Sequence, residues 1–148
     1  MSTYDIGAFQ TNPKDTGFVP QELWDLHGGD GILVTGIIKL CQRFLLELLT
    51  VKGTIPFDTK RGSSLLTFVR TGQIRNDIDA YVYFQYSIQE VLQNLWGDEL
   101  TTDPNDERIK SVDINSVSFL KNVIVYSVQL NSMAGASRQV QIPLQTLP

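Results

Sequence analysis

The sequence contains few of the residues that build disulfides, metal sites and many active sites. In 148 residues it has one cysteine, Cys41, and one histidine, His27. A single cysteine cannot close an internal disulfide, and the two residues together are too few for a structural zinc site. A Ser-His-Asp triad would depend on His27, in a glycine-rich stretch, and the sequence has no G-x-S-x-G motif. We therefore expect no metal site, no cofactor and no catalytic triad.

Positive charge and long uncharged hydrophobic runs are also scarce. Lys and Arg number 12 against 16 Asp and Glu, which gives a formal net charge of −4. Nucleic-acid binding usually requires clustered Lys and Arg, so we expect none. The longest apolar run, residues 31–49, carries Lys39, Arg43 and Glu47, which are costly in a bilayer centre. The N-terminus lacks the basic start and apolar core of a signal peptide, so we expect neither membrane insertion nor export by that route.

What the sequence does contain is typical of one globular domain. Hydrophobic residues make up 42% and charged residues 19% of the chain, and a chain of this length can bury a substantial core. Residues 1–30 combine Gly, Pro and irregularly spaced aromatic residues, which favours an extended N-terminal arm. We expect residues 31–148 to form a single α+β domain.

Three segments before residue 100 have the apolar spacing of helices. We expect these helices at residues 31–50, 63–72 and 76–96. The hydroxyl of Ser63 can cap the second helix, Gly72 suits its end, and Gly97 ends the third. The predicted apolar face of the third helix consists of Ile78, Tyr81, Val82, Ile88, Val91, Leu92 and Leu95.

After residue 107 the apolar spacing changes to alternation, which predicts strands. The strands contain Val112 and Ile114, then Ile124, Tyr126, Val128 and Leu130, then Val140, Ile142 and Leu144. Residues 131–137, which include Gly135, predict the turn of a final hairpin. Pro143 cannot donate to a ladder, which places the last strand at a sheet edge or at a point where pairing ends. The predicted fold class is α+β: an extended N-terminal arm, three helices, then a small, mostly antiparallel C-terminal sheet ending in a β-hairpin.

The connector between the first two predicted helices is built on Gly53, Pro56, Phe57 and Gly62. Gly53 can take a positive φ after the helix, and Pro56 forces the preceding residue to be extended. We expect Phe57 to enter the core as a plug. The connector would then fix the angle between the two helices.

Two further patterns suggest ligand sites but fail on spacing. Residues 60–64 resemble a phosphate loop, yet Asp58 stands where a Walker motif has its second glycine. Gly62 and Ser63 at a helix N-terminus could still hold an anion, and Lys60 and Arg61 are either partner contacts or solvated charge. Residues 103–106 resemble the start of a calcium loop, but Arg108 occupies its glycine position. A solvated loop is the simpler interpretation.

The acidic residues leave one enzymatic alternative, a small lysozyme-like glycoside hydrolase that cleaves peptidoglycan. It would use two of Glu47, Asp58, Glu90 and Glu99. A retaining pair lies about 5 Å apart and an inverting pair roughly 6.5 to 9.5 Å apart. The spacing of these residues in the sequence does not force any two together, so surface carboxylates are the default interpretation.

The parts follow one another in a recognisable order. The first helix ends in Leu48-Leu49-Thr50, and then come Gly53, Pro56, Phe57, Gly62 and Leu65, a long amphipathic helix, a charged loop with Arg108-Ile109, and terminal strands. Over residues 31–145 this order resembles the gene-25-like family of baseplate wedge proteins from contractile phage tails. Relatives of that family include a wedge subunit of type VI secretion baseplates. Many members have a glutamate where this chain has Thr54, and Glu-Pro-Arg where it has Asp106-Glu107-Arg108.

The resemblance implies a structural, non-enzymatic protein that docks on other wedge subunits and initiates the tail sheath. It implies that Asp106, Glu107 and Arg108 contact wedge partners. It also implies that the terminal strands exchange pairing with the sheath protein, because an edge strand can recruit another chain. The residues expected in this exchange are Val140, Gln141, Ile142, Leu144, Ile124, Tyr126 and Val128.

The same resemblance gives expectations about the assembly. Multiple copies would sit in a symmetric baseplate of the virion, after assembly in the host cytoplasm. The N-terminal arm could reach the tail tube or hub. Two alternatives remain: a type VI secretion baseplate, and a plain hairpin edge that Pro143 protects from strand exchange.

Overall fold

The computed structural model describes residues 5–6, 18–19, 33–34 and 36–146. Its helices are α1 (Gly36–Leu49), α2 (Leu65–Arg70) and α3 (Asp77–Asp98), with a 3-10 turn η1 (Asn105–Glu107). Its strands are β1 (Asp5–Ile6), β2 (Phe18–Val19), β3 (Leu33–Val34), β4 (Ile109–Leu120), β5 (Val123–Ser132) and β6 (Ser137–Gln145). The expected arm, residues 1–30, lies outside the described residues apart from β1 and β2, and so does His27.

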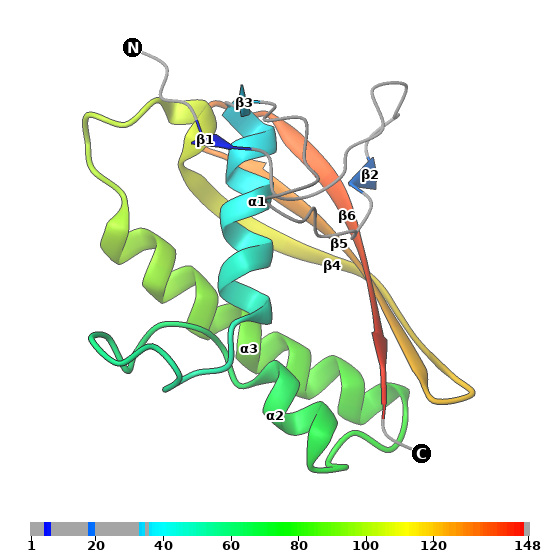
Figure 1. Ribbon diagram of the computed structural model, residues 1–148. Helices are drawn as coiled ribbons and strands as arrows, with labels where there is room; N and C mark the ends of the chain where they lie inside the picture. Colours follow the sequence, from blue (N-terminus) through cyan, green and yellow to red (C-terminus); the bar gives the residue numbers. More distant parts are fainter. Residues whose placement is uncertain (1–4, 7–17, 20–32, 35, 147–148) are drawn as a thin grey trace.

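The predicted α+β fold is confirmed, with three helices before a three-stranded antiparallel C-terminal sheet (Figure 1). The strand order of the larger sheet is β2-β6-β5-β4. Strand β2 pairs with β6 in parallel, and β1 and β3 form a separate antiparallel pair. The helices cover one face of the sheet, where alternate residues of β5 and β6 are fully buried.

Two turns connect the long strands. The β4–β5 turn consists of Lys121 and Asn122, whose φ angles are 50° and 64°. A two-residue loop with both φ positive is a type I′ turn, which fits the twist of a hairpin. The predicted β5–β6 turn is confirmed, with the Ser132 backbone N–H donating to Ala136 O at 2.8 Å and Gly135 at φ 83°.

The helix ends differ from the prediction in three places. Helix α1 begins at Gly36, later than expected. Ser64, not Ser63, stands at the cap position of α2, and the Ser63 hydroxyl donates to Leu48 O at 2.6 Å while it accepts from Leu65 N at 3.4 Å. Asn76 caps α3 by accepting from Asp79 N at 2.8 Å, and α3 continues through Gly97. No helix within the described ranges has both the length and the apolar character needed to cross a membrane.

The predicted apolar face of α3 is buried in its second half, at Ile88, Val91, Leu92 and Leu95, but not at its start. Ile78, Tyr81 and Val82 are 75%, 44% and 54% exposed, respectively. The buried positions are Ala80, Phe84, Ser87, Ile88, Val91, Leu92 and Leu95. Both sets have helical spacing, so periodicity alone could not choose between them. In the observed orientation of α3, the ring of Phe84 stacks on that of Tyr126 of β5, with the ring centroids 3.8 Å apart.

The burial of the Cys41 thiol in the core predicts how the free energy of unfolding depends on pH. Burial raises the pKa of the Cys41 thiol to about 12, an effect that Arg138 partly offsets. The Cys41 thiol ionises at a lower pH in the unfolded chain than in the folded chain. Its contribution to the free energy of unfolding is therefore fully present below about pH 8.5 and is lost as the pH rises toward the folded pKa.

We therefore expect Cys41→Ala to flatten the decline in the free energy of unfolding above about pH 9, measured by urea denaturation at several pH values. A residual decline remains because burial also raises the pKa of Tyr126. An equally steep decline in the wild type and the variant would contradict the prediction.

Candidate interaction surfaces

The connector between α1 and α2 is closed at its base by backbone contacts. Val51 and Ser63 form a parallel bridge, Lys52 N donates to Ser63 O at 3.1 Å, and Ser63 N donates to Thr50 O at 2.9 Å. Gly62 has a φ of +91°, and a Cβ there would lie 2.4 Å from Thr50 O. This position therefore requires glycine, both for its φ and for the close approach.

A buried carboxylate joins the connector to two helices. Glu47 of α1 accepts hydrogen bonds from Gly62 N and from the Asn94 side-chain amide of α3, both at 2.8 Å. The Asn94 amide also donates to Lys60 O at 2.9 Å. Arg61 places its Nε 3.8 Å from the second oxygen of Glu47. The connector is thus fixed to α1 and α3 together.

The other acids considered for hydrolysis also have internal partners. Glu90 accepts from Ser64 N at 2.9 Å and from Lys52 Nζ at 2.7 Å, which raises the pKa of Lys52. Glu99 accepts from Ile109 N at 2.8 Å, and burial raises its pKa. Asp58 accepts from the backbone of Lys60 at 3.2 Å. The bonds of Glu90 and Glu99 join elements that are distant in sequence, whereas the bond of Asp58 is local to the connector.

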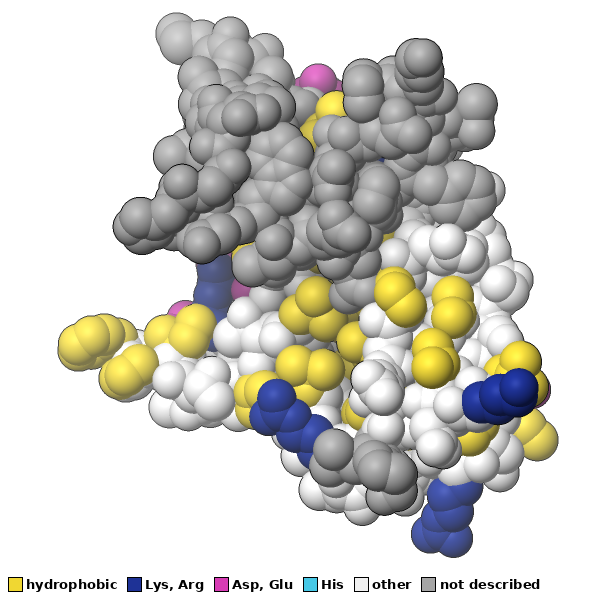
Figure 2. Space-filling view, turned by 45° about the vertical axis from the view of Figure 1, so that its right-hand side comes forward, with side chains coloured by type: hydrophobic (Ala, Val, Ile, Leu, Met, Phe, Trp, Pro, Cys, Tyr) yellow, Lys and Arg dark blue, Asp and Glu magenta, His cyan; other side chains and the backbone are white. Residues whose placement is uncertain are grey.

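The prediction that Phe57 plugs the core is wrong, because its side chain is 99% exposed. The connector bonds to itself, with Asp58 N donating to Ile55 O and Arg61 N to Asp58 O, both at 3.2 Å. Its middle therefore turns outward from a closed base, and Ile55 is 38% exposed. Figure 1 shows the connector projecting from the body at the left, and Figure 2 shows hydrophobic side chains at the tip of that projection.

The expected wedge contact at Asp106, Glu107 and Arg108 is only partly on the surface. Glu107 is 2% exposed, so its expected role as a partner contact is corrected. Its carboxylate accepts from Gly36 N and Lys39 Nζ, each at 3.3 Å, because η1 packs against the start of α1. Asp106 and Arg108 are half-buried beside it.

The residues expected in strand exchange lie in two different strands. Ile124, Tyr126 and Val128 belong to β5, which pairs with β4 on one side and β6 on the other, so they offer no free edge. Val140 and Ile142 of β6 are fully buried, Leu144 is half-buried and Gln141 is exposed. Of these two strands, only β6 can contribute a backbone edge, and the three β5 residues are corrected to core positions.

The outer side of β6 can be deduced from its hydrogen bonds. Thr146 N donates to Asn122 O at 2.7 Å, so even-numbered residues at this end direct their backbone groups toward β5. Because directions alternate along an antiparallel strand, those of Gln141 and Pro143 point outward. Pro143 has no N–H to offer there, as the sequence predicts for an edge. Strand β2 lies beside Gln139 and Val140 on the outer side.

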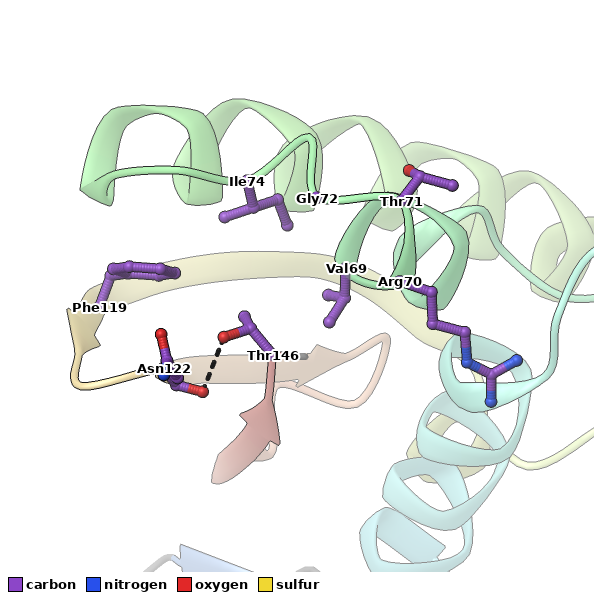
Figure 3. Close-up of a pocket in the computed structure, with 8 residues that line it drawn as sticks. All are labelled: Val69, Arg70, Thr71, Gly72, Ile74, Phe119, Asn122 and Thr146. Carbon is purple, nitrogen blue, oxygen red and sulfur yellow. Dashed lines mark hydrogen bonds between the residues drawn. The ribbon is translucent and has the colours of Figure 1, made fainter. Parts of the chain in front are cut away.

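A hollow of about 410 Å³ lies between the end of α2 and the β4–β5 turn (Figure 3). It is lined by Val69, Arg70, Thr71, Gly72, Ile74, Phe119, Asn122 and Thr146. Thr146 Oγ1 donates to Asn122 O across it at 2.9 Å. Arg70 is the one ionisable side chain in this lining, so the hollow lacks an acid-base pair. Among the described residues, no group of three or more His, Cys, Asp or Glu could hold a metal ion.

The fixed base of the connector can be tested with a matched pair of glycine substitutions. Gly62→Ala adds the 2.4 Å clash to an unfavourable φ, whereas Gly53→Ala has φ +87° and open space within 4 Å. We expect Gly53→Ala to cost about 1–2 kcal/mol and Gly62→Ala at least about 3 kcal/mol of unfolding free energy, measured by urea denaturation. Equal costs would show that the base of the connector is not fixed as described.

The surfaces described above are the braced connector tip, the half-buried pair Asp106 and Arg108, and the outer backbone of β6. None of them carries a ligand-binding motif that identifies a family. No protein-family model matches the sequence, and a search of curated proteins finds no significant match.

Proposed function

We propose that this protein is a non-enzymatic structural subunit of a contractile tail baseplate. It docks on other wedge subunits and initiates the tail sheath, in multiple copies within the virion. The sequence resemblance to gene-25-like proteins supports the proposal, as does an α+β fold of the implied order. A type VI secretion baseplate would use the same surfaces, and the neighbouring genes would distinguish the two systems.

The observation that carries the proposal is the parallel pairing of β2 with β6. Phe18 and Val19 come from a distant part of the chain, yet they lie in register with Gln139 and Val140. The edge of β6 therefore accepts a strand other than its hairpin partner. With only two residues in β2, the displacement of few backbone bonds would admit a strand of the sheath protein.

Docking on wedge subunits is assigned to the connector tip. Phe57 is fully exposed on a loop whose base is fixed to α1 and α3, so little ordering is required when it binds. Aromatic residues are frequent anchors of protein interfaces. Asp106 and Arg108 are candidates for additional polar contacts, whereas Glu107 is turned inward.

Strand exchange at β6 is tested by Gln141→Pro, which removes an outward N–H and leaves the β5–β6 ladder intact. We expect baseplates with this variant to form no sheath, because the incoming strand loses a backbone donor. Sheath growth is counted by electron microscopy on baseplates from the same system.

Gln141→Thr is the matched control, since it changes the same side chain but keeps the N–H. It should support sheath at the wild-type level. Normal sheath on baseplates that contain Gln141→Pro would overturn the assignment of the edge. Ile142 is unsuitable for this test, because its burial means that a polar substitution would damage the core.

Docking through the connector tip is tested by Phe57→Ala. Because the ring is exposed, the free energy of unfolding should stay within about 0.5 kcal/mol of the wild type. Binding to wedge subunits, measured by pull-down and calorimetry, should weaken by about tenfold or more. Thr59→Ala, at another exposed position of the connector, should bind normally. Unchanged binding by Phe57→Ala would refute the docking assignment, and wild-type protein that binds neither wedge nor sheath subunits would refute the proposed function.

A further inference from the structure

The outer strand β4 is capped at both ends by side chains of α3 and of Glu99, the residue that directly follows this helix. Near one end, Phe119 N donates to Asp77 Oδ1 at 3.0 Å. At the other, Ile109 N donates to Glu99 Oε1 at 2.8 Å, beyond the last turn of α3, and Trp96 Nε1 donates to Ile109 O at 3.0 Å. Helix α3 therefore runs beside this edge and protects its two ends.

The middle of β4 has no such protection. Residues Val112, Ile114 and Val117 oppose Leu130, Val128 and Tyr126 of β5. Those β5 residues direct their backbone groups toward β6, so their partners on β4 turn theirs outward. The pairing register shifts between Ile114 and Ser116. The backbone groups of Ile114, before the shift, and of Val117, after it, both point outward. Among the described residues, no hydrogen bond involves the outward backbone groups of Val112, Ile114 and Val117.

A groove follows this open stretch between α3 and β4. It consists of two adjoining hollows of about 330 and 350 Å³ that share Tyr81 and Ile114. Exposed Ile78 and Tyr81 of α3 supply apolar surface in the groove. Helix and strand together thus provide apolar contacts beside free backbone donors and acceptors, which is what an extended peptide requires.

The charge of the groove restricts its occupant. Its lining includes Asp77 and Asp113 and contains no Lys or Arg. A second copy pairing edge to edge would bring acidic groups together. The chain's own β2 is also poorly placed, since it lies at the opposite side of the sheet. Charge complementarity favours a separate segment with basic residues.

We propose that the groove between α3 and β4 binds an extended segment of a partner protein, with apolar residues alternating with Lys or Arg. The segment adds to the middle of β4 as a further strand. Its apolar side chains contact Tyr81 and Ile114, and its basic side chains, on the opposite face of the added strand, approach Asp113. The Asp113 carboxylate also accepts from Asn131 Nδ2 at 2.8 Å. This surface is independent of the connector tip and of β6, so it goes beyond the proposed function.

The test uses the full chain and an array of synthetic peptides about eight residues long, in which Val or Ile alternates with Lys, Gln or Glu. The Lys series should bind most strongly and weaken with added salt, and the Glu series should not bind. Equal binding of the Lys and Glu series, or binding of neither, would overturn the proposal.

Two variants locate the binding. Val117→Pro removes an outward N–H, and Val117→Thr keeps it; the first should lose about tenfold or more in affinity for the best Lys peptide, and the second should lose little. Tyr81→Glu gives a second measurement on the exposed face of α3 and should also reduce affinity. Gln141→Pro on the opposite edge should have no effect. Full affinity in both groove variants would contradict the assigned occupant. So would a wild-type dimer that the Val117→Pro substitution dissociates.

Discussion

The carboxylate of Glu47 is the point on which the helical part of this structure depends. It is 8% exposed, and it bonds the Gly62 backbone and the Asn94 side chain at the same time. One buried group therefore sets the connector against both α1 and α3. A buried carboxylate without these partners would be strongly destabilising, so the contact is required as soon as the helices pack. The exposed connector tip is a consequence of this fixed base.

The long antiparallel strands β6, β5 and β4 form a unit with two sides, and the edges on these sides are restricted by different means. At β6, a short strand from the start of the chain covers part of the edge, and Pro143 removes one outward donor. At β4, α3 caps the two ends and leaves the middle open. An edge that is limited in length can pair with a chosen segment but is a poor template for continuous aggregation. Both edges are therefore suited to specific strand addition.

The sequence predicted the elements well because apolar spacing reports which faces are buried. The α+β order and the final hairpin were predicted correctly, whereas the last strand is not the outermost one, because β2 pairs with residues 139–140 of β6. The exposure of Phe57 was not predicted, because a hydrophobic residue after Gly and Pro looks the same whether a loop folds inward or closes on its own base. Glu107 was misassigned because its burial depends on Lys39 and the Gly36 backbone, which are distant in sequence. Contacts of this kind depend on tertiary packing and leave no local pattern.

The exposed apolar residues lie where the core does not need them. Phe57, Ile78, Tyr81 and Val82 are exposed, while the core is formed by other residues of the same segments. Such side chains gain little in the isolated fold, since hydrophobic stabilisation requires removal from water. Ile78 and Tyr81 lie in the groove beside β4, and Phe57 lies at the connector tip, so each place offers apolar surface that a partner can bury. The core residues and the exposed apolar residues of these segments are therefore distinct, and only the exposed ones are accessible to a partner.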